Sequence, residues 1–175
     1  MSAAIEELKR AIRDVPDFPK PGIIFKDVTT LLKDRVAFRN GIDLFTQLCS
    51  GRRVDKVVGI ESRGFIFGSL VADRLGIGFV PVRKPGKLPA ATRSASYQLE
   101  YGQDSLEIHQ DAVGRGEQVL IVDDVIATGG TAKATGDLVT QLGGEIAAFA
   151  FLIELGFLNG RERLAGHEVL SLIRY

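Results

Sequence analysis

The segment VLIVDDVIATGGTAKAT, which begins at Val119, constrains the fold of this chain more than any other part of the sequence. Its first four residues, Val119–Val122, form an unbroken apolar run that is typical of a strand buried on both faces of a parallel sheet. Two aspartates follow at the predicted carboxyl end of this strand, and a turn with two glycines comes next. After the turn, residues at helical spacing predict a buried helix face: Ala134 or Thr135, Leu138, Val139 and Leu142. The segment therefore predicts a strand, a tight turn and a helix, the repeating unit of an α/β fold.

The turn from Thr128 to Thr131 has the composition of an anion site. Gly129 and Gly130 can adopt positive φ angles and let a ligand approach the backbone closely. The start of the following helix leaves main-chain N–H groups unpaired and carries a partial positive charge, which suits a phosphate. The two threonine hydroxyls add neutral donors. We therefore predict a phosphate site here.

The adjacent acids, Asp123 and Asp124, have a different chemistry. Carboxylates repel a phosphate, but they accept hydrogen bonds from a sugar diol or from the water shell of Mg²⁺. An anion site beside a diol acceptor describes a ribose 5-phosphate. A bare pair of aspartates would more simply cap a helix or lie in solvent, and the ordered turn that follows favours the ligand site.

This segment resembles the motif by which the type I phosphoribosyltransferases bind 5-phosphoribosyl 1-pyrophosphate (PRPP), and the form DDxxATGGT is most similar to the adenine-specific members. The resemblance runs from PDFPKPGIIFKD to LIELGFLNGRERL, almost the whole chain. It implies that Asp123 and Asp124 hold the ribose 2′ and 3′ hydroxyls, and that Ala127 to Thr131 hold the 5-phosphate. Members acting on 6-oxopurines usually have an acid where this chain has Ala127, which argues against hypoxanthine or guanine.

Two further loops contain groups that suit pyrophosphate. The first loop, Glu61–Gly64, lies between the apolar run that ends at Ile60 and a helical pattern. Its main-chain N–H groups and the guanidinium of Arg63 would bind an anion. The other is a cationic loop around Pro85 and Gly86. For each of the two loops, the alternative interpretation is an ordinary solvated segment that binds no ligand. The resemblance implies pyrophosphate binding by Glu61, Ser62, Arg63, Arg83, Lys84 and Lys87, with Arg63 and Arg83 also catalytic. It also implies that the cationic loop completes the site of a neighbouring subunit in a homodimer.

Residues 83–110 interrupt the alternation of strands and helices and predict a flexible loop followed by a two-stranded flap. Apolar or aromatic residues alternate with polar ones on both sides of Gly102: Tyr97, Leu99 and Tyr101, then Leu106 and Ile108. Long insertions of this kind are often active-site lids. The residues alone indicate no more than an exposed hairpin carboxylate at Glu100. The resemblance implies that Glu100 lies over the purine and shares a proton with N7, and that Tyr101 covers the closed site.

Residues 1–30 contain an amphipathic helix followed by a proline-rich segment, Pro16–Asp27. The resemblance implies that this region is a hood over the base, in which Ile24, Phe25 and Lys26 bind adenine. Plain core packing is the alternative for Ile24 and Phe25. Leu155, with Glu154 beside it, matches the family more weakly at a position near the base.

The remaining apolar runs predict one α/β domain spanning residues 1–175, with a mostly parallel sheet flanked by helices. The predicted elements are strands at Val57–Ile60, Gly78–Val82 and Ile146–Ile153, a helix at Gly64–Leu75, and Val169–Ile173 either closing or supporting the sheet. Ligands of such sheets bind beyond the carboxyl ends of the strands, which is where Glu61 and Asp123 are predicted.

Composition excludes several classes of protein. Lys and Arg number 22 and Asp and Glu number 22, so the net charge of zero gives no general basis for nucleic-acid or membrane binding. No apolar run is long enough for a membrane span or a signal peptide. The single cysteine, Cys49, lies in a helical pattern and is expected to be a buried thiol. We therefore expect a cytoplasmic protein.

Taken with the resemblance, the sequence predicts transfer of the phosphoribosyl group of PRPP to adenine, giving AMP and pyrophosphate, with Mg²⁺ carried by PRPP and no direct protein ligand for the metal beyond a water-mediated contact to Asp123 and Asp124. A transferase for xanthine or orotate would keep the PRPP motif and change the hood. A nucleotide-sensing regulator that binds RNA or DNA would share the fold, but it should display a basic face.

Overall fold

The computed structural model describes residues 2–98 and 103–175, and the chain divides into two compact units, Met1–Gln47 and Leu48–Tyr175. Within the described residues, no helix combines the length and apolar character that a membrane crossing requires.

The first unit consists of helices and a small hairpin. Its elements in chain order are α1 (Ser2–Ala11), β1 (Arg13–Pro16), β2 (Ile24–Asp27), α2 (Thr29–Lys33) and α3 (Arg35–Cys49), which ends just inside the second unit. The predicted amphipathic helix is present as α1, and the side chain of its residue Leu8 is buried. The antiparallel pairing of β1 with β2 was not predicted, because its register is supported by ion pairs, Arg13 with Asp27 and Lys26 with Asp14, rather than by an apolar alternation.

The second unit contains a five-stranded sheet that is parallel throughout. Its strands are β3 (Lys56–Ile60), β4 (Gly78–Val82), β7 (Gln118–Ile126), β8 (Glu145–Glu154) and β9 (Val169–Arg174), in the spatial order β4-β3-β7-β8-β9. The predicted α/β fold with a parallel sheet is confirmed, and β9 closes one edge of the sheet rather than merely supporting it.

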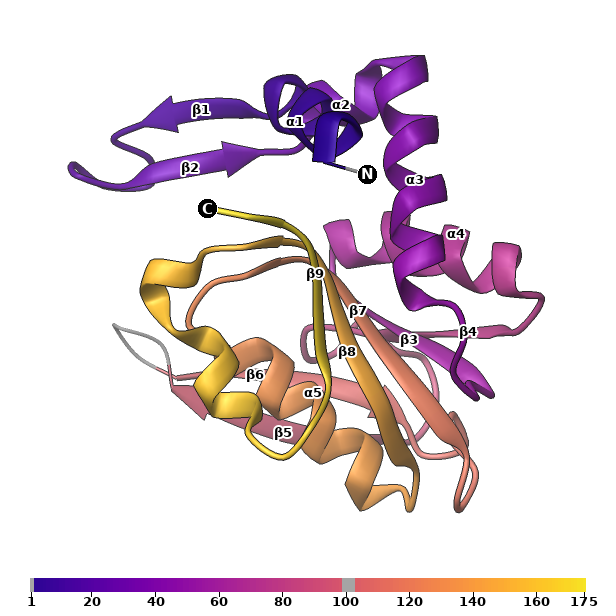
Figure 1. The fold of residues 1–175 in the computed structure, drawn as a ribbon. Coiled ribbons are helices and arrows are strands. Elements are labelled where there is room, and N and C mark those ends of the chain that lie inside the picture. The colour runs from indigo at the N-terminus through magenta and orange to yellow at the C-terminus, as the bar shows by residue number, and fades with distance from the viewer. Residues whose placement is uncertain (1, 99–102) are drawn as a thin grey trace. The chain divides into compact units, whose positions relative to one another are not determined.

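The strand order places a switch point between β3 and β7. From β3 the chain proceeds to β4 on one side, and from β7 it proceeds to β8 and β9 on the other (Figure 1). Connections on the two sides of such a point leave on opposite faces, so a crevice opens beyond the strand ends there. The ends of β3 and β7 are therefore where a ligand is expected.

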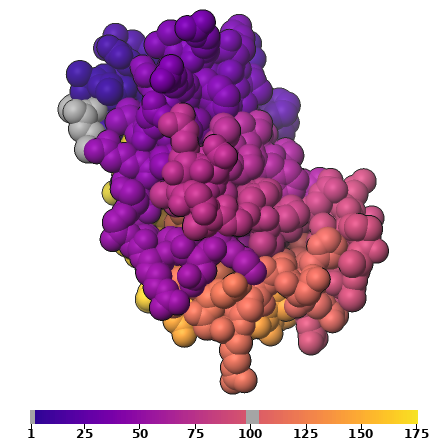
Figure 2. Space-filling model, turned by 90° about the vertical axis from the view of Figure 1, so that its right-hand side faces the viewer, coloured from indigo at the N-terminus to yellow at the C-terminus, as the bar shows by residue number. Residues whose placement is uncertain are grey.

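Both faces of the sheet are covered. Helix α4 (Arg63–Leu75) packs on one face against β3 and β7, and magenta atoms from the region of α4 cover much of the middle of the view in Figure 2. Helix α5 (Gly130–Gln141) and the hairpin β5 (Thr92–Gln98) and β6 (Gln103–His109) cover the other face. Alternate strand residues serve the two sides: Val58 and Ile121 join the core under α5, whereas Val122 lies against Gly68 of α4.

Strand β7 is longer than the sequence predicts. It runs to Ile126, so Asp123 and Asp124 lie within it and not beyond its end. The reason is its two different neighbours: pairing with β3 stops at Val122, while pairing with β8 continues to Ile126. The acids therefore occupy a half-open part of the strand, directly at the switch point.

The predicted flap is an antiparallel hairpin, with β5 starting at Thr92, earlier than the sequence indicates. Leu99, Glu100, Tyr101 and Gly102 lie outside the described residues. After β8 come two short 3-10 helices, η1 (Gly156–Leu158) and η2 (Gly160–Leu164), which lead to β9.

Candidate active site

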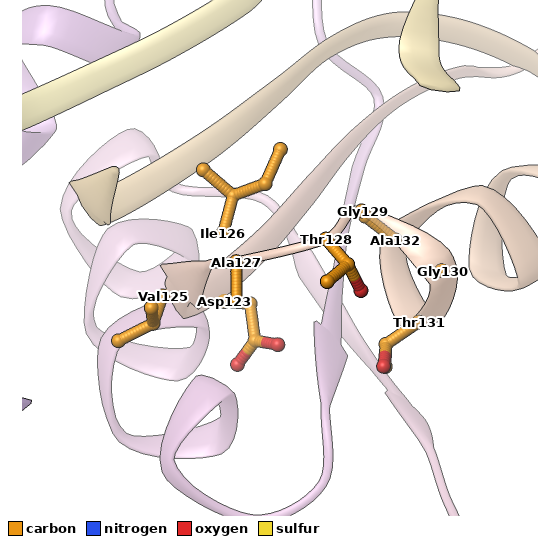
Figure 3. Close-up of a pocket in the computed structure, with 9 residues that line it drawn as sticks. All are labelled: Asp123, Val125, Ile126, Ala127, Thr128, Gly129, Gly130, Thr131 and Ala132. Carbon is orange, nitrogen blue, oxygen red and sulfur yellow. The ribbon is translucent and has the colours of Figure 1, made fainter. Parts of the chain in front are cut away.

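A pocket of about 90 Å³ lies where β7 leads into α5. Every residue from Asp123 to Ala132 lines this pocket except Asp124. Figure 3 shows the Asp123 carboxylate and the hydroxyls of Thr128 and Thr131 pointing to the same side of the turn. The strand, turn and helix predicted from the sequence thus form one concave polar surface.

The start of α5 is built to face an anion. Gly129 has a φ of 80°, in the region that favours glycine, and no side chain caps the helix. A main-chain bond, from Lys133 N–H to the Gly129 carbonyl at 2.9 Å, closes the first turn. The helix dipole and the first-turn N–H groups therefore face the pocket without a competing side-chain acceptor.

The two aspartates have different surroundings although they are adjacent. Asp123 lines the pocket, and its Oδ1 accepts the main-chain N–H of Asp124 at 2.8 Å. Burial, and then the charge of Asp124, raise the pKa of the Asp123 carboxyl well above its usual range. Asp124 is only 5% exposed and forms an ion pair with the Nε of Arg63. Only Asp123 therefore faces the pocket, whereas Asp124 links β7 to the start of α4.

Glycines bring α4 close to the acids. A Cβ on Gly64 would lie 2.8 Å from Oδ1 of Asp123 and 3.0 Å from the carbonyl oxygen of Val122, and a Cβ on Gly68 would lie 3.3 Å from Cα of Gly59. Like α5, α4 starts without a side-chain cap, and the Glu61–Ser62 peptide just before it is cis. A second uncapped helix start thus lies beside the acids.

Glu61 contacts the cationic loop. Its Oε2 accepts the main-chain N–H of Lys84 at 2.8 Å, and its Oε1 lies 3.3 Å from Nη2 of Arg83. The first of these bonds is the main reason why the pKa of Glu61 is lowered. These contacts indicate that Glu61 supports the cationic loop and does not itself bind pyrophosphate, because a carboxylate repels that anion.

The cationic loop is also tied to the hairpin. The Lys84 ammonium pairs with Asp104 on β6, and the Tyr97 hydroxyl donates to the same carboxylate at 3.2 Å. The Arg83 and Glu107 main chains exchange hydrogen bonds, and Arg83 Nη1 donates to the Lys87 carbonyl at 3.2 Å. Of the predicted pyrophosphate ligands, Arg83 is thus held near Glu61, while Lys84 is engaged with the hairpin.

The predicted base-binding residues are distributed over both units. Ile24, Phe25 and Lys26 lie on β2 in the first unit; the Phe25 ring meets Phe18 edge-on at 5.3 Å, and Lys26 pairs with Asp14. Leu155 follows β8 in the second unit, and its N–H donates to the Ile126 carbonyl at 3.0 Å. Glu100 and Tyr101 lie outside the described residues.

The resemblance named Glu154 only as a position near the base, and sequence reasoning missed its partners and the contact of Gly160. Glu154, at the end of β8, is 3% exposed and is held by Arg161, and Gly160 packs against the pocket loop. A glutamate ending an apolar run, seven residues before an arginine, was the available signal for the first pair. No residue pattern indicates the contact of Gly160.

Comparisons with known proteins agree with this geometry. The sequence profile of the phosphoribosyl transferase domain matches residues 27–166. An adenine phosphoribosyltransferase of Acidobacterium capsulatum is 58% identical over 174 residues, which is 99% of this chain and 96% of the relative.

Solved structures give the same result. The crystal structure of adenine phosphoribosyltransferase from Thermoanaerobacter pseudethanolicus has a TM-score of 0.96 at 55% identity, covering 98% of this chain and 99% of that one. The enzyme from Saccharomyces cerevisiae, complexed with an imino-altritol bisphosphate and adenine, has a TM-score of 0.92 at 43% identity, covering 98% and 99%.

Proposed function

This chain belongs to the phosphoribosyltransferase family, in its adenine-specific branch, and we propose on this premise that it transfers the 5-phosphoribosyl group of PRPP to N9 of adenine, giving AMP and pyrophosphate. The observation that carries the proposal is the pocket lined by Asp123 and Val125–Ala132. It joins an uncapped helix start to a carboxylate, which suits a phosphate and a diol on one sugar.

In this proposal the 5-phosphate binds the N–H groups from Thr128 to Thr131, with Ala127 forming the wall before them. Asp123 accepts from a ribose hydroxyl. The resemblance predicts that Asp124 supplies a second acceptor, although this residue lies outside the pocket lining and pairs with Arg63. The sugar is thereby held at both ends, and its C1 is fixed relative to the incoming base.

The reaction breaks the bond between C1 and the pyrophosphate oxygen, N9 attacks the electron-poor C1, and the proton that adenine carries on N7 passes to Glu100. Negative charge then develops on the leaving group. Arg63, Arg83 and Lys87, together with the N–H groups from Ser62 to Gly64 at the start of α4, would stabilise that charge. Lys84 would join them only after leaving Asp104, with which it pairs.

The described residues contain no group of three or more His, Cys, Asp or Glu side chains that could hold a metal on their own. One pocket carboxylate, Asp123, fits a Mg²⁺ ion that arrives on PRPP, since this ion commonly takes one or two carboxylates together with substrate phosphates and water. When bound, Mg²⁺ would neutralise charge on the pyrophosphate.

Several roles come from the family resemblance and remain predictions: Glu100 shares a proton with N7, Tyr101 covers the site, and Ile24, Phe25, Lys26 and Leu155 contact adenine. The cationic loop would complete the site of a second subunit, so we expect a homodimer. Replacing Glu100 with Gln should lower kcat more than it raises KM for PRPP, and an unchanged kcat would exclude Glu100 as the residue that shares the N7 proton. The buried thiol of Cys49, whose pKa burial raises to about 12, is compatible with the predicted cytoplasmic location.

Incubation with PRPP, Mg²⁺ and one base at a time tests the proposal. Pyrophosphate release with adenine, and not with hypoxanthine, guanine, xanthine or orotate, supports it. Release with xanthine or orotate alone would establish the alternative transferase. Tight RNA or DNA binding without turnover would establish the regulator.

A further inference from the structure

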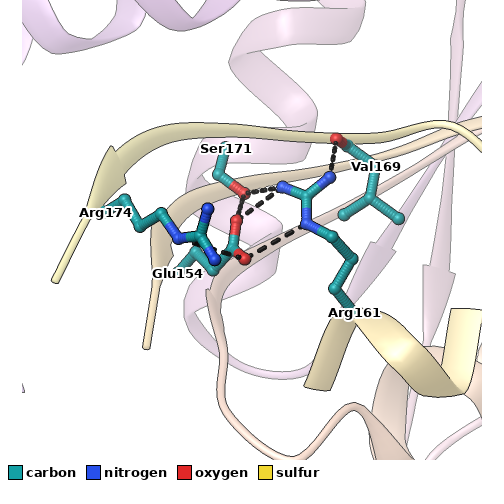
Figure 4. Close-up of polar contacts among 5 residues, drawn as sticks. All are labelled: Glu154, Arg161, Val169, Ser171 and Arg174. Atoms are coloured by element: carbon teal, nitrogen blue, oxygen red, sulfur yellow. Dashed lines mark hydrogen bonds and ion pairs between the residues drawn. The ribbon is translucent and has the colours of Figure 1, made fainter. Parts of the chain in front are cut away.

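The carboxylate of Glu154 on β8 is enclosed by partners from two other elements, η2 and β9 (Figure 4). Its Oε1 accepts from Nε of Arg161 at 3.1 Å, and its Oε2 accepts from Nη2 of the same guanidinium at 2.6 Å. The hydroxyl of Ser171 on β9 donates to Oε2 at 2.6 Å, and Nε of Arg174 lies 3.7 Å from Oε1. The Arg161 contacts are the main reason why the pKa of Glu154 is lowered, so the carboxylate is ionised at neutral pH.

Arg161 joins η2 to the sheet. While its fork binds Glu154 on β8, its Nη1 donates to the Val169 carbonyl of β9 at 2.7 Å. Two-point contacts of this kind fix the orientation of a guanidinium as well as its position. The first turn of η2 is therefore attached to the ends of two neighbouring strands.

Gly160, the residue before Arg161, contacts the turn Ala127–Gly129, to which the proposed function assigns the 5-phosphate. A Cβ on Gly160 would lie 2.2 Å from the carbonyl oxygen of Ala127 and 2.9 Å from the main-chain nitrogen of Gly129. In the opposite direction, a Cβ on Gly129 would lie 2.3 Å from the Gly160 carbonyl oxygen. The two backbones are in direct contact, and neither glycine leaves space for a side chain.

The strand that supplies Glu154 supports the same loop from its other end. Glu154 pairs in register with Ile126, the last residue of β7, and Leu155 N–H donates to the Ile126 carbonyl. Ile126 and Gly160 thus hold the two sides of Ala127, and Glu154 fixes both of them, one through the sheet and one through Arg161.

We propose that Glu154 and Arg161 are positioning residues for PRPP: their ion pair seats Gly160 against the turn Ala127–Gly129 and so sets the spacing of the N–H groups that bind the 5-phosphate. This rests on the proposed function, which places the 5-phosphate at that turn. Neither side chain lines the pocket, so both act through the backbone. The arrangement adds a support to a loop that no side chain caps.

Two proteins, Arg161→Met alone and Arg161→Met combined with Glu154→Gln, separate a positioning role from a role in stability. Replacing Arg161 with Met leaves Glu154 buried with its main partner removed, so the unfolding midpoint should fall. Replacing Glu154 with Gln in the same protein removes the buried charge, and the midpoint should recover. We expect KM for PRPP to be raised about tenfold in both proteins, within the range that small displacements of a binding group produce, while KM for adenine changes less than the KM for PRPP. A role in stability alone predicts that KM for PRPP recovers with the midpoint, and that result would overturn the proposal.

Two matched controls complete the test. Arg174→Ala removes another cation near Glu154 without touching η2, so KM for PRPP should stay close to that of the wild type; a rise equal to that of the Arg161 variant would contradict the proposal. Gly160→Ala should raise KM for PRPP, whereas Gly156→Ala should not, because its Cβ would meet Nε of Arg174 at 2.9 Å, on a flexible side chain, and the carbonyl oxygen of the last residue, Tyr175, at 3.2 Å. Equal KM values for the two glycine variants would also contradict it.

The wild-type protein decides between two kinds of failure. A wild type that forms no AMP from adenine and PRPP would refute the proposed function. An active wild type together with a folded double variant of normal KM for PRPP would refute only the positioning role. If Arg161→Met does not fold, the double variant and Arg161→Lys carry the test, and the lysine should restore the midpoint more fully than KM because it cannot form the two-point contact.

Discussion

Asp123 and Asp124 illustrate how neighbouring identical residues acquire different properties from a strand. Successive side chains of a strand point to opposite faces, so Asp123 lines the pocket while Asp124 pairs with Arg63. The sequence predicts the two acids as an equivalent pair. The structure instead gives one of them to the pocket and the other to a cation at the start of α4.

Replacing Asp124 with Asn should weaken PRPP binding by about 1–3 kcal/mol, as expected for the loss of a charge-assisted hydrogen bond. The change also releases Arg63 from its ion pair, so part of the loss reflects a cation held less firmly at the leaving group. Titration calorimetry with PRPP and Mg²⁺ measures the effect. Asp137→Asn, which breaks an exposed pair with Lys133 on α5, is the control. An unchanged dissociation constant for Asp124→Asn would exclude this residue from the ribose site.

Asp123 should oppose stability while serving binding. Its pKa in the folded protein is raised above the ordinary 3.8, so the folded state binds this proton more tightly than the unfolded chain does. The resulting penalty is absent at low pH, appears as pH rises through 3.8, and is complete once pH exceeds the folded value. Asp123→Asn should therefore raise the unfolding midpoint at neutral pH and weaken PRPP binding. A midpoint that is unchanged at neutral pH, or that rises equally at acid and neutral pH, would contradict this account.

The same residue makes PRPP affinity depend on pH. A protonated Asp123 is a poorer acceptor for a ribose hydroxyl, so affinity should fall as pH is lowered through the raised pKa of this carboxyl. The phosphate groups of PRPP also titrate, with a pKa of about 6. The difference between the pH profiles of the wild type and Asp123→Asn removes that shared contribution, and identical profiles would show that Asp123 does not bind the sugar.

At the scale of elements, the site depends on three backbones that approach closely. Gly64 brings α4 to β7, and Gly129 and Gly160 bring the phosphate turn to η2. The sequence predicts flexible glycines at the turn so that a ligand can approach. The structure adds a second requirement at Gly129, since the far side of this residue is occupied by another part of the chain.

Two glycine variants separate these requirements. Gly129 and Gly116 have φ angles of 80° and 74°, so alanine at either position carries a backbone cost of about 1–2 kcal/mol. Only at Gly129 would the new Cβ also overlap a backbone atom, because nothing lies within 4 Å of a Cβ on Gly116. Gly129→Ala should therefore lower the unfolding midpoint more than Gly116→Ala and should alone raise KM for PRPP. Equal effects of the two variants on both quantities would show that the contact with Gly160 is unimportant.

Elements with a strong apolar pattern were predictable from the sequence, and those stabilised by specific pairs were not. The strands β3, β4, β7 and β8 are present where they were predicted because each contains an apolar run, although β7 extends beyond its predicted end. The β1–β2 hairpin depends on ion pairs between distant residues, and the end of β7 depends on the length of its neighbour β8. Such information lies in the pairing of segments and not in either segment alone.

At the scale of the whole molecule, the strand order decides where the chemistry lies. The sequence predicts parallel strands, and the resemblance supplies the ligand, but only the order β4-β3-β7-β8-β9 shows that Glu61 and Asp123 flank one switch point. The same order places Glu154 beside the end of β7, which is why a residue outside the motif can support the phosphate turn.

Ligand binding should stabilise the folded chain in proportion to the phosphate contacts. A ligand at 100 times its dissociation constant adds about 2.7 kcal/mol to the free energy of unfolding. For a chain of this size, each kcal/mol corresponds to about 2–4 °C, so AMP at that excess should raise the unfolding midpoint by about 5–10 °C. Adenosine at the same concentration lacks the 5-phosphate and should raise the midpoint much less, because the N–H groups of the turn gain no partner. Thermal scans with AMP, adenosine and inorganic phosphate measure the three shifts. Equal shifts with AMP and adenosine would place the main binding energy outside the turn that begins at Ala127.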